Sequence, residues 1–418
     1  MNTLKVYIHR RCISYLTFLK WLLLATIVGI IVGSIGTLFH FAIGYATKLR
    51  LNNPYTIYFL PINGIIIVFL YHISKQGERL NTNLVLESIR SNEKLPLRMA
   101  PLIFIATVLT HLSGGSSGRE GAALQLGGSL SSFIGRLFHL NDDDLRLMTM
   151  CGMSAAFAAL FRTPIGATIF AMEVISVGIM YYVALVPCIL SALIGYGISG
   201  YFGIAATHYI LTLPSNFDLL LTAKVLLLGI LCAILSICFC KTLHQTNHLY
   251  KRLIHNDYIR ILVGSALLLL LIHIFKTRDY LGAGTNIIDN AIHGEAIPYA
   301  FILKIIFTAL TLGAGFKGGE IVPSFFVGAT FGAFIGPIIG LPASFAASLS
   351  LIAVFCGVTN CPITSFILAV EIFSGQSCIY FMLIIATSYM LSGYTGLYSK
   401  QKIMYSKTKP TFVNTNAH

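Results

Sequence analysis

Residues 114–122 constrain the fold of this chain more than any other stretch. They read Gly-Gly-Ser-Ser-Gly-Arg-Glu-Gly-Ala and lie between the apolar runs 100–112 and 122–138. Non-helical backbone at membrane depth is tolerated only where it is buried in protein or lines a cavity. An ionisable residue at that depth indicates a functional site. We therefore interpret Glu120 as a carboxylate beside an ion path, just inside a helix that begins within the membrane.

The composition agrees with a membrane protein. Only 10% of the 418 residues are charged, against about 25% in soluble proteins. Apolar runs fill the chain from residue 21 to about residue 397, so we expect no separate soluble domain. The formal net charge of +13 would suggest nucleic-acid binding in a soluble protein. In a membrane protein the positive-inside rule explains this charge better, because cytoplasmic segments carry an excess of Lys and Arg. We therefore expect no nucleic-acid partner. We also expect a cell-membrane protein with both termini in the cytoplasm.

Four segments are predicted from the distribution of polar stretches. Residues 1–20 are basic and aromatic, which is typical of a cytoplasmic amphipathic helix on the membrane surface. Residues 21–206 and 207–398 form two transmembrane repeats, the second of which starts with the polar linker 207–218. Residues 399–418 form a cytoplasmic tail. Many apolar segments have only about 12 to 17 residues, too few to span upright, so tilted or partial spans are expected.

An internal repeat supports the division into two halves. Four residues of the first half (Gly115, Gly118, Glu120 and Gly128) recur 200 positions later as Gly315, Gly318, Glu320 and Gly328. Pro164 and Glu173 recur as Pro362 and Glu371, at an offset of 198. Broken helices at corresponding positions of two halves indicate a binding site at the repeat interface, near the bilayer midplane. For the two helix glutamates, packing or a subunit interface is the favoured interpretation over proton transfer.

The loops at Gly118 and Gly319 are expected to aim helix N-termini at this interface. The free N–H groups and the positive dipole end of a helix N-terminus favour an anion. A cation path would favour carbonyl ends or rings of carboxylates instead. An intramembrane enzyme would need a nucleophile with a base, or a metal motif such as His-Glu-x-x-His, and the sequence has neither. A non-transporting subunit would leave two glutamates at duplicated glycine breaks unexplained.

At these motifs the chain resembles the CLC family of anion channels and proton-coupled anion transporters, over about residues 21–402. Residues 118–121, Gly-Arg-Glu-Gly, resemble its gating-glutamate motif, whose glutamate alternately occupies and vacates an anion site. Residues 319–323, Gly-Glu-Ile-Val-Pro, resemble its second anion-site motif, Gly-x-Phe-x-Pro. Tyr398 matches the tyrosine whose hydroxyl reaches the central anion. The resemblance implies a homodimer with one anion pathway per subunit, and an all-α polytopic fold of two pseudo-symmetric, inverted repeats of tilted and broken helices.

The chain departs from the common family pattern at several positions. Residues 81–85 read Asn-Thr-Asn-Leu-Val where the family has Gly-Ser-Gly-Ile-Pro, and Ala122 replaces a proline. Glu320 stands inside the second motif, and Val174 lies where many exchangers place an inner proton glutamate. These departures resemble the fluoride-exporting CLC-F branch and imply fluoride export coupled to proton exchange. A chloride/proton antiporter and a passive voltage-gated chloride channel are the alternatives.

The resemblance and the loop pattern together define the predicted site. Glu120 is the expected gating and proton glutamate, and Glu320 is a candidate second proton glutamate. The predicted anion-binding residues are Asn81, Thr82, Asn83, Gly118, Arg119, Gly121, Gly319, Ile321, Val322 and Tyr398. The expected partners are a halide ion, protons, the lipid bilayer and a second copy of the chain, with no metal and no cofactor.

Simpler interpretations of some of these residues stay open. Asn81 and Asn83 have the residue type that caps a helix N-terminus. Glu320 has Lys317 as a possible partner. The Arg119 side chain is expected to satisfy carbonyls or a carboxylate more readily than to bind the ion.

Overall fold

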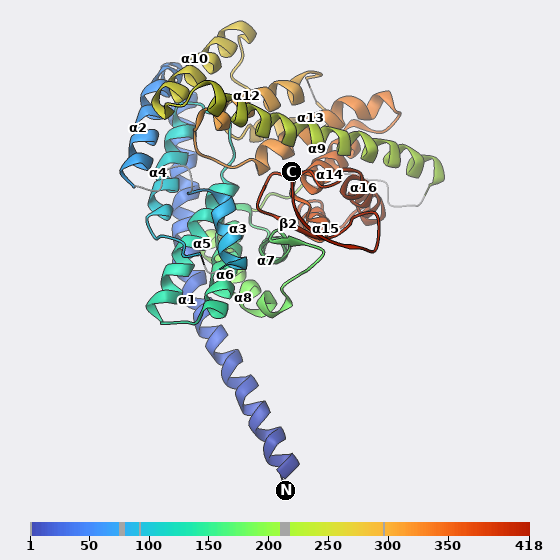
Figure 1. Ribbon diagram of the computed structural model, residues 1–418. Coiled ribbons are helices and arrows are strands. Elements are labelled where there is room, and N and C mark those ends of the chain that lie inside the picture. The colour runs from blue at the N-terminus through green and yellow to red at the C-terminus, as the bar shows by residue number, and fades with distance from the viewer. Residues whose placement is uncertain (1, 75–79, 92, 210–217, 296) are drawn as a thin grey trace.

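The computed structural model describes residues 2–74, 80–91, 93–209, 218–295 and 297–418, with side chains from residue 14 onward. The described chain is helical almost throughout (Figure 1). The helices of the first half are α1 (Asn2–Asn52), η1 (Pro54–Phe59), α2 (Leu60–Ile73), α3 (Thr82–Arg90), α4 (Met99–Leu112), α5 (Glu120–Leu137), α6 (Asp142–Phe161), α7 (Pro164–Glu173), η3 (Tyr182–Ala184) and α8 (Leu185–Tyr201). Those of the second half are α9 (Leu219–Leu253), α10 (Asp257–Phe275), α11 (Thr285–Ile292), α12 (Ala300–Ala314), α13 (Ile321–Ile338), α14 (Ala343–Thr359), α15 (Pro362–Ile372) and α16 (Cys378–Leu391).

Helix lengths confirm the expectation of a polytopic protein with full and partial spans. Seven helical stretches in the described residues are long and apolar enough to cross a membrane: Ser14–Asn52, Pro54–Ile73, Asp142–Phe161, Tyr182–Tyr201, Leu219–Leu253, Asp257–Phe275 and Ile321–Ile338. Five further apolar helices in this described part of the chain have only 10–17 residues, among them α4 and α12. A helix rises 1.5 Å per residue, so these shorter helices end inside a hydrocarbon layer of about 30 Å.

The N-terminal helix differs from the predicted arrangement. Residues 1–20 were expected to form a separate surface helix, but α1 runs without a break from Asn2 to Asn52. No proline interrupts this stretch, and Pro54 follows two residues after its last residue, Asn52. Figure 1 shows the first part of α1 projecting away from the bundle. Of the expected linker 207–218, residues 210–217 lie outside the described part of the chain.

The two halves repeat a turn between a long helix and a short one. The residues that follow α6 and α14, Arg162 and Asn360, are both in the left-handed region, with φ of 61° and 58°. A proline then starts each short helix, α7 and α15, as its fixed φ favours. The two turns are 198 residues apart, as the repeat in the sequence predicts.

Two glutamates cap helices reciprocally. Glu173, the last residue of α7, caps the N-terminus of α15, and Glu371, near the end of α15, caps the N-terminus of α7. The Glu173 carboxylate accepts hydrogen bonds from the backbone N–H groups of Ile363 (3.0 Å) and Thr364 (2.8 Å). In the mirror arrangement, Glu371 accepts from the N–H groups of Ile165 (3.0 Å) and Gly166 (2.8 Å). Carboxylates satisfy the free donors of a helix N-terminus and its dipole. This reciprocal capping agrees with a packing role for both residues.

The tail of the chain folds instead of trailing from the bundle. Strand β1 (Ser176–Val177) pairs in parallel with β2 (Lys402–Tyr405), which pairs antiparallel with β3 (Phe412–Asn416). The buried amide of Gln401 donates to the carbonyls of Val174 (3.0 Å) and Thr359 (2.8 Å). The tail therefore covers the backbone beside Val174. The polar sequence of the tail did not predict this packing.

Candidate functional site

Two irregular segments, 113–119 and 315–320, meet in the middle of the protein. The N–H group of Gly118 donates to the carbonyl of Gly319 at 2.7 Å, and the N–H group of Gly319 donates back at 2.8 Å. At this two-residue bridge the two halves join through their backbones. A Cβ atom on Gly319 would lie 2.7 Å from the Gly121 nitrogen and 2.9 Å from the Glu120 nitrogen. The close approach of the backbones therefore requires glycine.

The bridge shows that the repeat, as predicted from the sequence, was aligned one residue out of register. The sequence pattern aligned Gly118 with Gly318 and Glu120 with Glu320, but the structure pairs Gly118 with Gly319. Helix α5 begins at Glu120 after Arg119, whereas α13 begins after Glu320. Glu320 thus takes the place of Arg119 in the second half. The two glutamates are therefore not symmetry equivalents, and their side chains can have different functions.

The Glu120 carboxylate is fully buried between the N-termini of α5 and α13. Its Oε2 atom accepts from the N–H groups of Arg119 (2.9 Å) and Val322 (3.4 Å). Its Oε1 atom has no hydrogen-bond partner among the described residues. A carboxylate here takes up N–H donors that could otherwise hold an anion.

The Arg119 side chain turns toward other groups. Its Nε atom lies 3.8 Å from Oε1 of Glu120, and its Nη1 donates to Nδ1 of His40 at 3.0 Å. These contacts agree with the interpretation that the Arg119 side chain satisfies a carboxylate and other protein groups. They do not place its guanidinium in the cavity described below.

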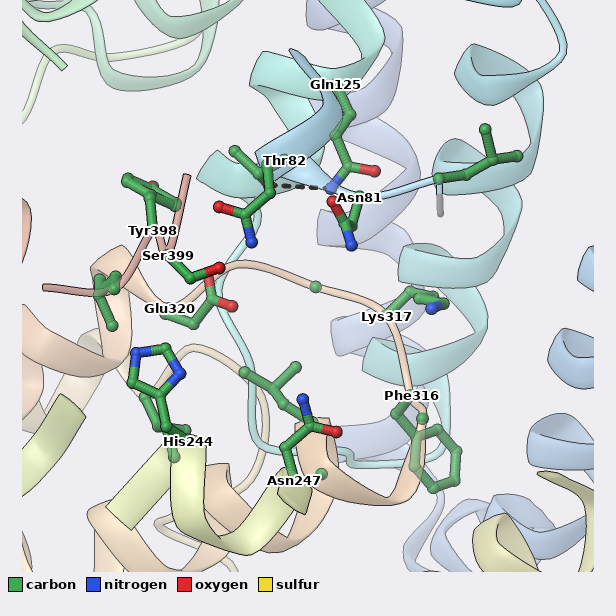
Figure 2. A pocket seen from close by; sticks show the side chains of 18 of the residues that line it. Asn81, Thr82, Gln125, His244, Asn247, Phe316, Lys317, Glu320, Tyr398 and Ser399 are labelled. Atoms are coloured by element: carbon green, nitrogen blue, oxygen red, sulfur yellow. Dashed lines mark hydrogen bonds between the residues drawn. The ribbon is translucent and has the colours of Figure 1, made fainter. Parts of the chain in front are cut away.

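The N-terminus of α3 brings the Asn-Thr-Asn run to the same region. Asn81 caps the helix, because its Oδ1 accepts from the N–H group of Leu84 at 3.2 Å. Thr82 Oγ1 donates to the Gly121 carbonyl at 3.4 Å and accepts from Gln125 Nε2 at 3.0 Å (Figure 2). The capping interpretation of Asn81 is therefore correct, and Figure 2 shows its side-chain amide beside the cavity.

Asn83 has a positioning contact. Its Oδ1 accepts from the N–H group of Lys400 at 3.1 Å, which fixes the segment that carries Tyr398 against α3. The ion pair of Lys400 with Glu87, at 3.2 Å, holds the same segment. Asn83 thus contributes to the site in two ways: it lies at the helix N-terminus, and it holds the segment that carries Tyr398.

Tyr398 is 2% exposed, and its hydroxyl has no hydrogen-bond partner among the described residues. It lies within electrostatic range of both Glu320 and Glu120. Most buried polar atoms in proteins are hydrogen bonded. A buried hydroxyl without a protein partner indicates that its partner is a ligand or water. That Tyr398 faces an ion path stays a prediction; the structure places it at the cavity described below.

A cavity of about 240 Å³ adjoins these groups. Asn81, Thr82, Asn83, Glu320 and Tyr398 line it, and so does Lys317, the suggested partner of Glu320 (Figure 2). The lining also includes residues that the sequence patterns did not single out: Gln125, His244, Asn247, Lys251, Arg260 and Ser399. Three cations and one carboxylate make its electrostatic character favourable for an anion. Gln125 was detectable in principle, because it follows Gly121 by four residues on one face of α5.

The other predicted anion-binding residues do not line this cavity. Gly118, Gly121, Gly319, Ile321 and Val322 belong to the bridge and to the first turns of α5 and α13. A Cβ on Gly121 would lie 3.3 Å from Thr82 Oγ1 and 3.6 Å from Glu320 Oε2. Lys317, the suggested partner of Glu320, has its Nζ 4.5 Å from the centroid of the Tyr71 ring.

Comparisons with known proteins agree with this geometry. Residues 64–393 match the family model described as voltage gated chloride channel. The chain is 33% identical over 395 residues to a chloride/fluoride channel protein of Pseudomonas syringae pv. tomato, which covers 93% of this chain and 87% of the relative. A crystal structure of a CLC-type fluoride/proton antiporter superposes with a TM-score of 0.88 at 32% identity, covering 93% of this chain and 98% of the other. A slow cyanobacterial Cl⁻/H⁺ antiporter shares the fold, with a TM-score of 0.75 at 17% identity, over 89% and 94% of the two chains.

Proposed function

Because the chain belongs to the voltage-gated chloride channel family, we propose that it exchanges fluoride for protons across the membrane. The observation that carries this proposal is the buried Glu120 carboxylate, bound at the N–H groups of two helix N-termini. In its charged form it occupies the donors that an anion needs. In its protonated form it releases them, so that movement of the anion and of the proton becomes coupled.

Fluoride is the proposed ion because of the groups around the cavity. Fluoride holds its water tightly, so a site must offer strong and close donors in exchange. The amide of Asn81, the backbone N–H groups at the α3 N-terminus and the Tyr398 hydroxyl are donors of this kind. The name of the fluoride/proton antiporter supports the same ion, whereas that of the relative from Pseudomonas syringae includes both chloride and fluoride.

The proposal includes a homodimer with one pathway per subunit and both termini in the cytoplasm of a cell-membrane protein. Family membership supports the first part, and the lysines and arginines near both chain ends support the second. Protein purified in detergent should therefore crosslink as pairs, and tags at both ends should be accessible from the cytoplasmic side only.

The first test is ion selectivity of the wild-type protein. Proteoliposomes loaded with fluoride are expected to release their halide at least about tenfold faster than proteoliposomes loaded with chloride. A tenfold difference corresponds to about 1.4 kcal/mol of discrimination. An ion-selective electrode measures the efflux, and a pH electrode records proton uptake in the same vesicles. Protein-free vesicles are the control. Equal rates for the two halides would refute the fluoride assignment, and fluoride efflux without proton movement would indicate a channel.

The Glu320 carboxylate is proposed as a second proton acceptor, on the cavity side of Glu120. The variant Glu320→Gln is expected to lose most of its fluoride-driven proton uptake, because the amide keeps the size of the side chain but carries no titratable proton. The same paired recording measures it. Exposed Glu295 offers a matched control, and Glu295→Gln should keep wild-type coupling. Normal coupling in Glu320→Gln would remove this residue from the mechanism.

A further inference from the structure

The position beside Glu173, where an inner proton glutamate was expected from the resemblance, has no titratable side chain. Val174 is fully buried, and the Gln401 amide donates to its carbonyl at 3.0 Å. An apolar and covered side chain cannot accept a proton from solvent. The described structure offers protons another route to Glu320, because Glu320 lines the cavity of about 240 Å³.

His244 on α9 lines this cavity together with Glu320 and Tyr398 (Figure 2). Its Nε2 lies 2.8 Å from the carbonyl oxygen of Gly396. A carbonyl only accepts, so Nε2 carries the hydrogen and donates it. Within the described residues, Nδ1 has no hydrogen-bond partner. The hydrogen bond to Gly396 therefore orients the ring and leaves one basic nitrogen for the cavity.

We propose that His244 is the proton-transfer residue that supplies Glu320 from the cavity side, an inference that rests on the proposed function. Nδ1 takes a proton from water in the cavity, and the ring becomes an imidazolium while Nε2–H stays bonded to Gly396. The Nδ1–H bond then breaks, and water carries the proton to the Glu320 carboxylate. The ring returns to its neutral form. The same nitrogen accepts and releases, so His244 stores a proton beside the cavity.

The groups around His244 favour delivery to Glu320. Those that line the cavity with it are Glu320, Tyr398, Lys251, Arg260 and Lys317. One turn earlier on α9, Cys240 lies within electrostatic range of Glu320 and Lys407. The Gly396 segment is held by the chain end, since its N–H group donates to the carbonyl of His418 at 3.0 Å. Glu320 is the carboxylate among the cavity-lining residues, so it is the acceptor that an imidazolium in this cavity would supply.

The test separates proton transfer from a structural role. His244→Gln keeps an amide N–H for the Gly396 carbonyl but cannot take up a proton. Proton uptake driven by a fluoride gradient is expected to fall at least about tenfold in this variant and in His244→Ala, within the range for positioned acid–base groups. Imidazole trapped inside the vesicles should restore coupling in His244→Ala. His248 is exposed one turn later on α9 and does not line the cavity, so His248→Gln should match wild type.

Three results would overturn the inference. Wild-type coupling in His244→Gln would show that the imidazole is dispensable. Lost coupling in His244→Ala without rescue by imidazole would assign the residue to holding the Gly396 segment. Wild-type protein that moves fluoride without protons would overturn the proposed exchange itself. The wild-type recording thus distinguishes failure of this inference from failure of the proposed function.

Discussion

Replacing Glu120 by glutamine should reduce fluoride-driven proton uptake by about a hundredfold or more, within the range for loss of a positioned acid–base group. The fully buried carboxylate accepts from the N–H groups of Arg119 and Val322. A glutamine side chain has the same shape but no exchangeable charge, so it cannot alternate between binding these donors and releasing them. Anion flux should change strongly as well, because protonation no longer controls whether the side chain at position 120 binds these N–H groups or releases them.

Simultaneous electrode recordings of fluoride and protons measure this effect in proteoliposomes. Glu295→Gln, at an exposed position, controls for loss of a negative charge. The elution volume of the purified variant in size-exclusion chromatography checks that it is folded. Coupled exchange at the wild-type ratio in Glu120→Gln would reject Glu120 as the gate, whatever the absolute flux.

A methyl group at Gly319 should abolish transport and destabilise the protein. The added Cβ would lie 2.7 Å and 2.9 Å from the backbone nitrogens of Gly121 and Glu120. Neither atom is the end of a flexible side chain, so relief requires the two segments to separate. Separation would break the reciprocal hydrogen bonds of 2.7 Å and 2.8 Å with Gly118. Overpacking costs about 1–3 kcal/mol or more, so we expect a lower melting temperature and fluoride flux reduced at least about tenfold.

Gly44→Ala is the matched control for this substitution. Gly44 lies in α1, and a Cβ there would meet nothing within 4 Å. Alanine in an unobstructed helix position generally stabilises by about 0.5–1 kcal/mol relative to glycine, so this variant should keep both stability and flux. Thermal unfolding in detergent and the fluoride efflux assay compare the two. Gly319→Ala protein with wild-type stability and transport would show that the bridge is not needed.

Much of the fold could be predicted from local patterns in the sequence. Long apolar runs define spans by length alone, and the short runs predict helices that end within the membrane. The glycine breaks at residues 114–118 and 315–319 locate the irregular segments because few other residues allow such close backbone approach. The reciprocal positions of Glu173 and Glu371 also followed from the repeat, although which N–H groups they cap did not.

The sequence alone determined the class of the protein, its two halves, and Glu120 at the start of a helix inside the membrane. These features depend on composition and on neighbours along the chain. Only the tertiary structure decided that Gly118 pairs with Gly319, that Glu320 corresponds to Arg119, and that His244 shares a cavity with Glu320. Such relations join residues far apart in sequence, and a shift of one residue in register exchanges the groups that face the site. Local patterns do not determine that register, whereas packing of the two halves and the hydrogen bonds between their backbones do.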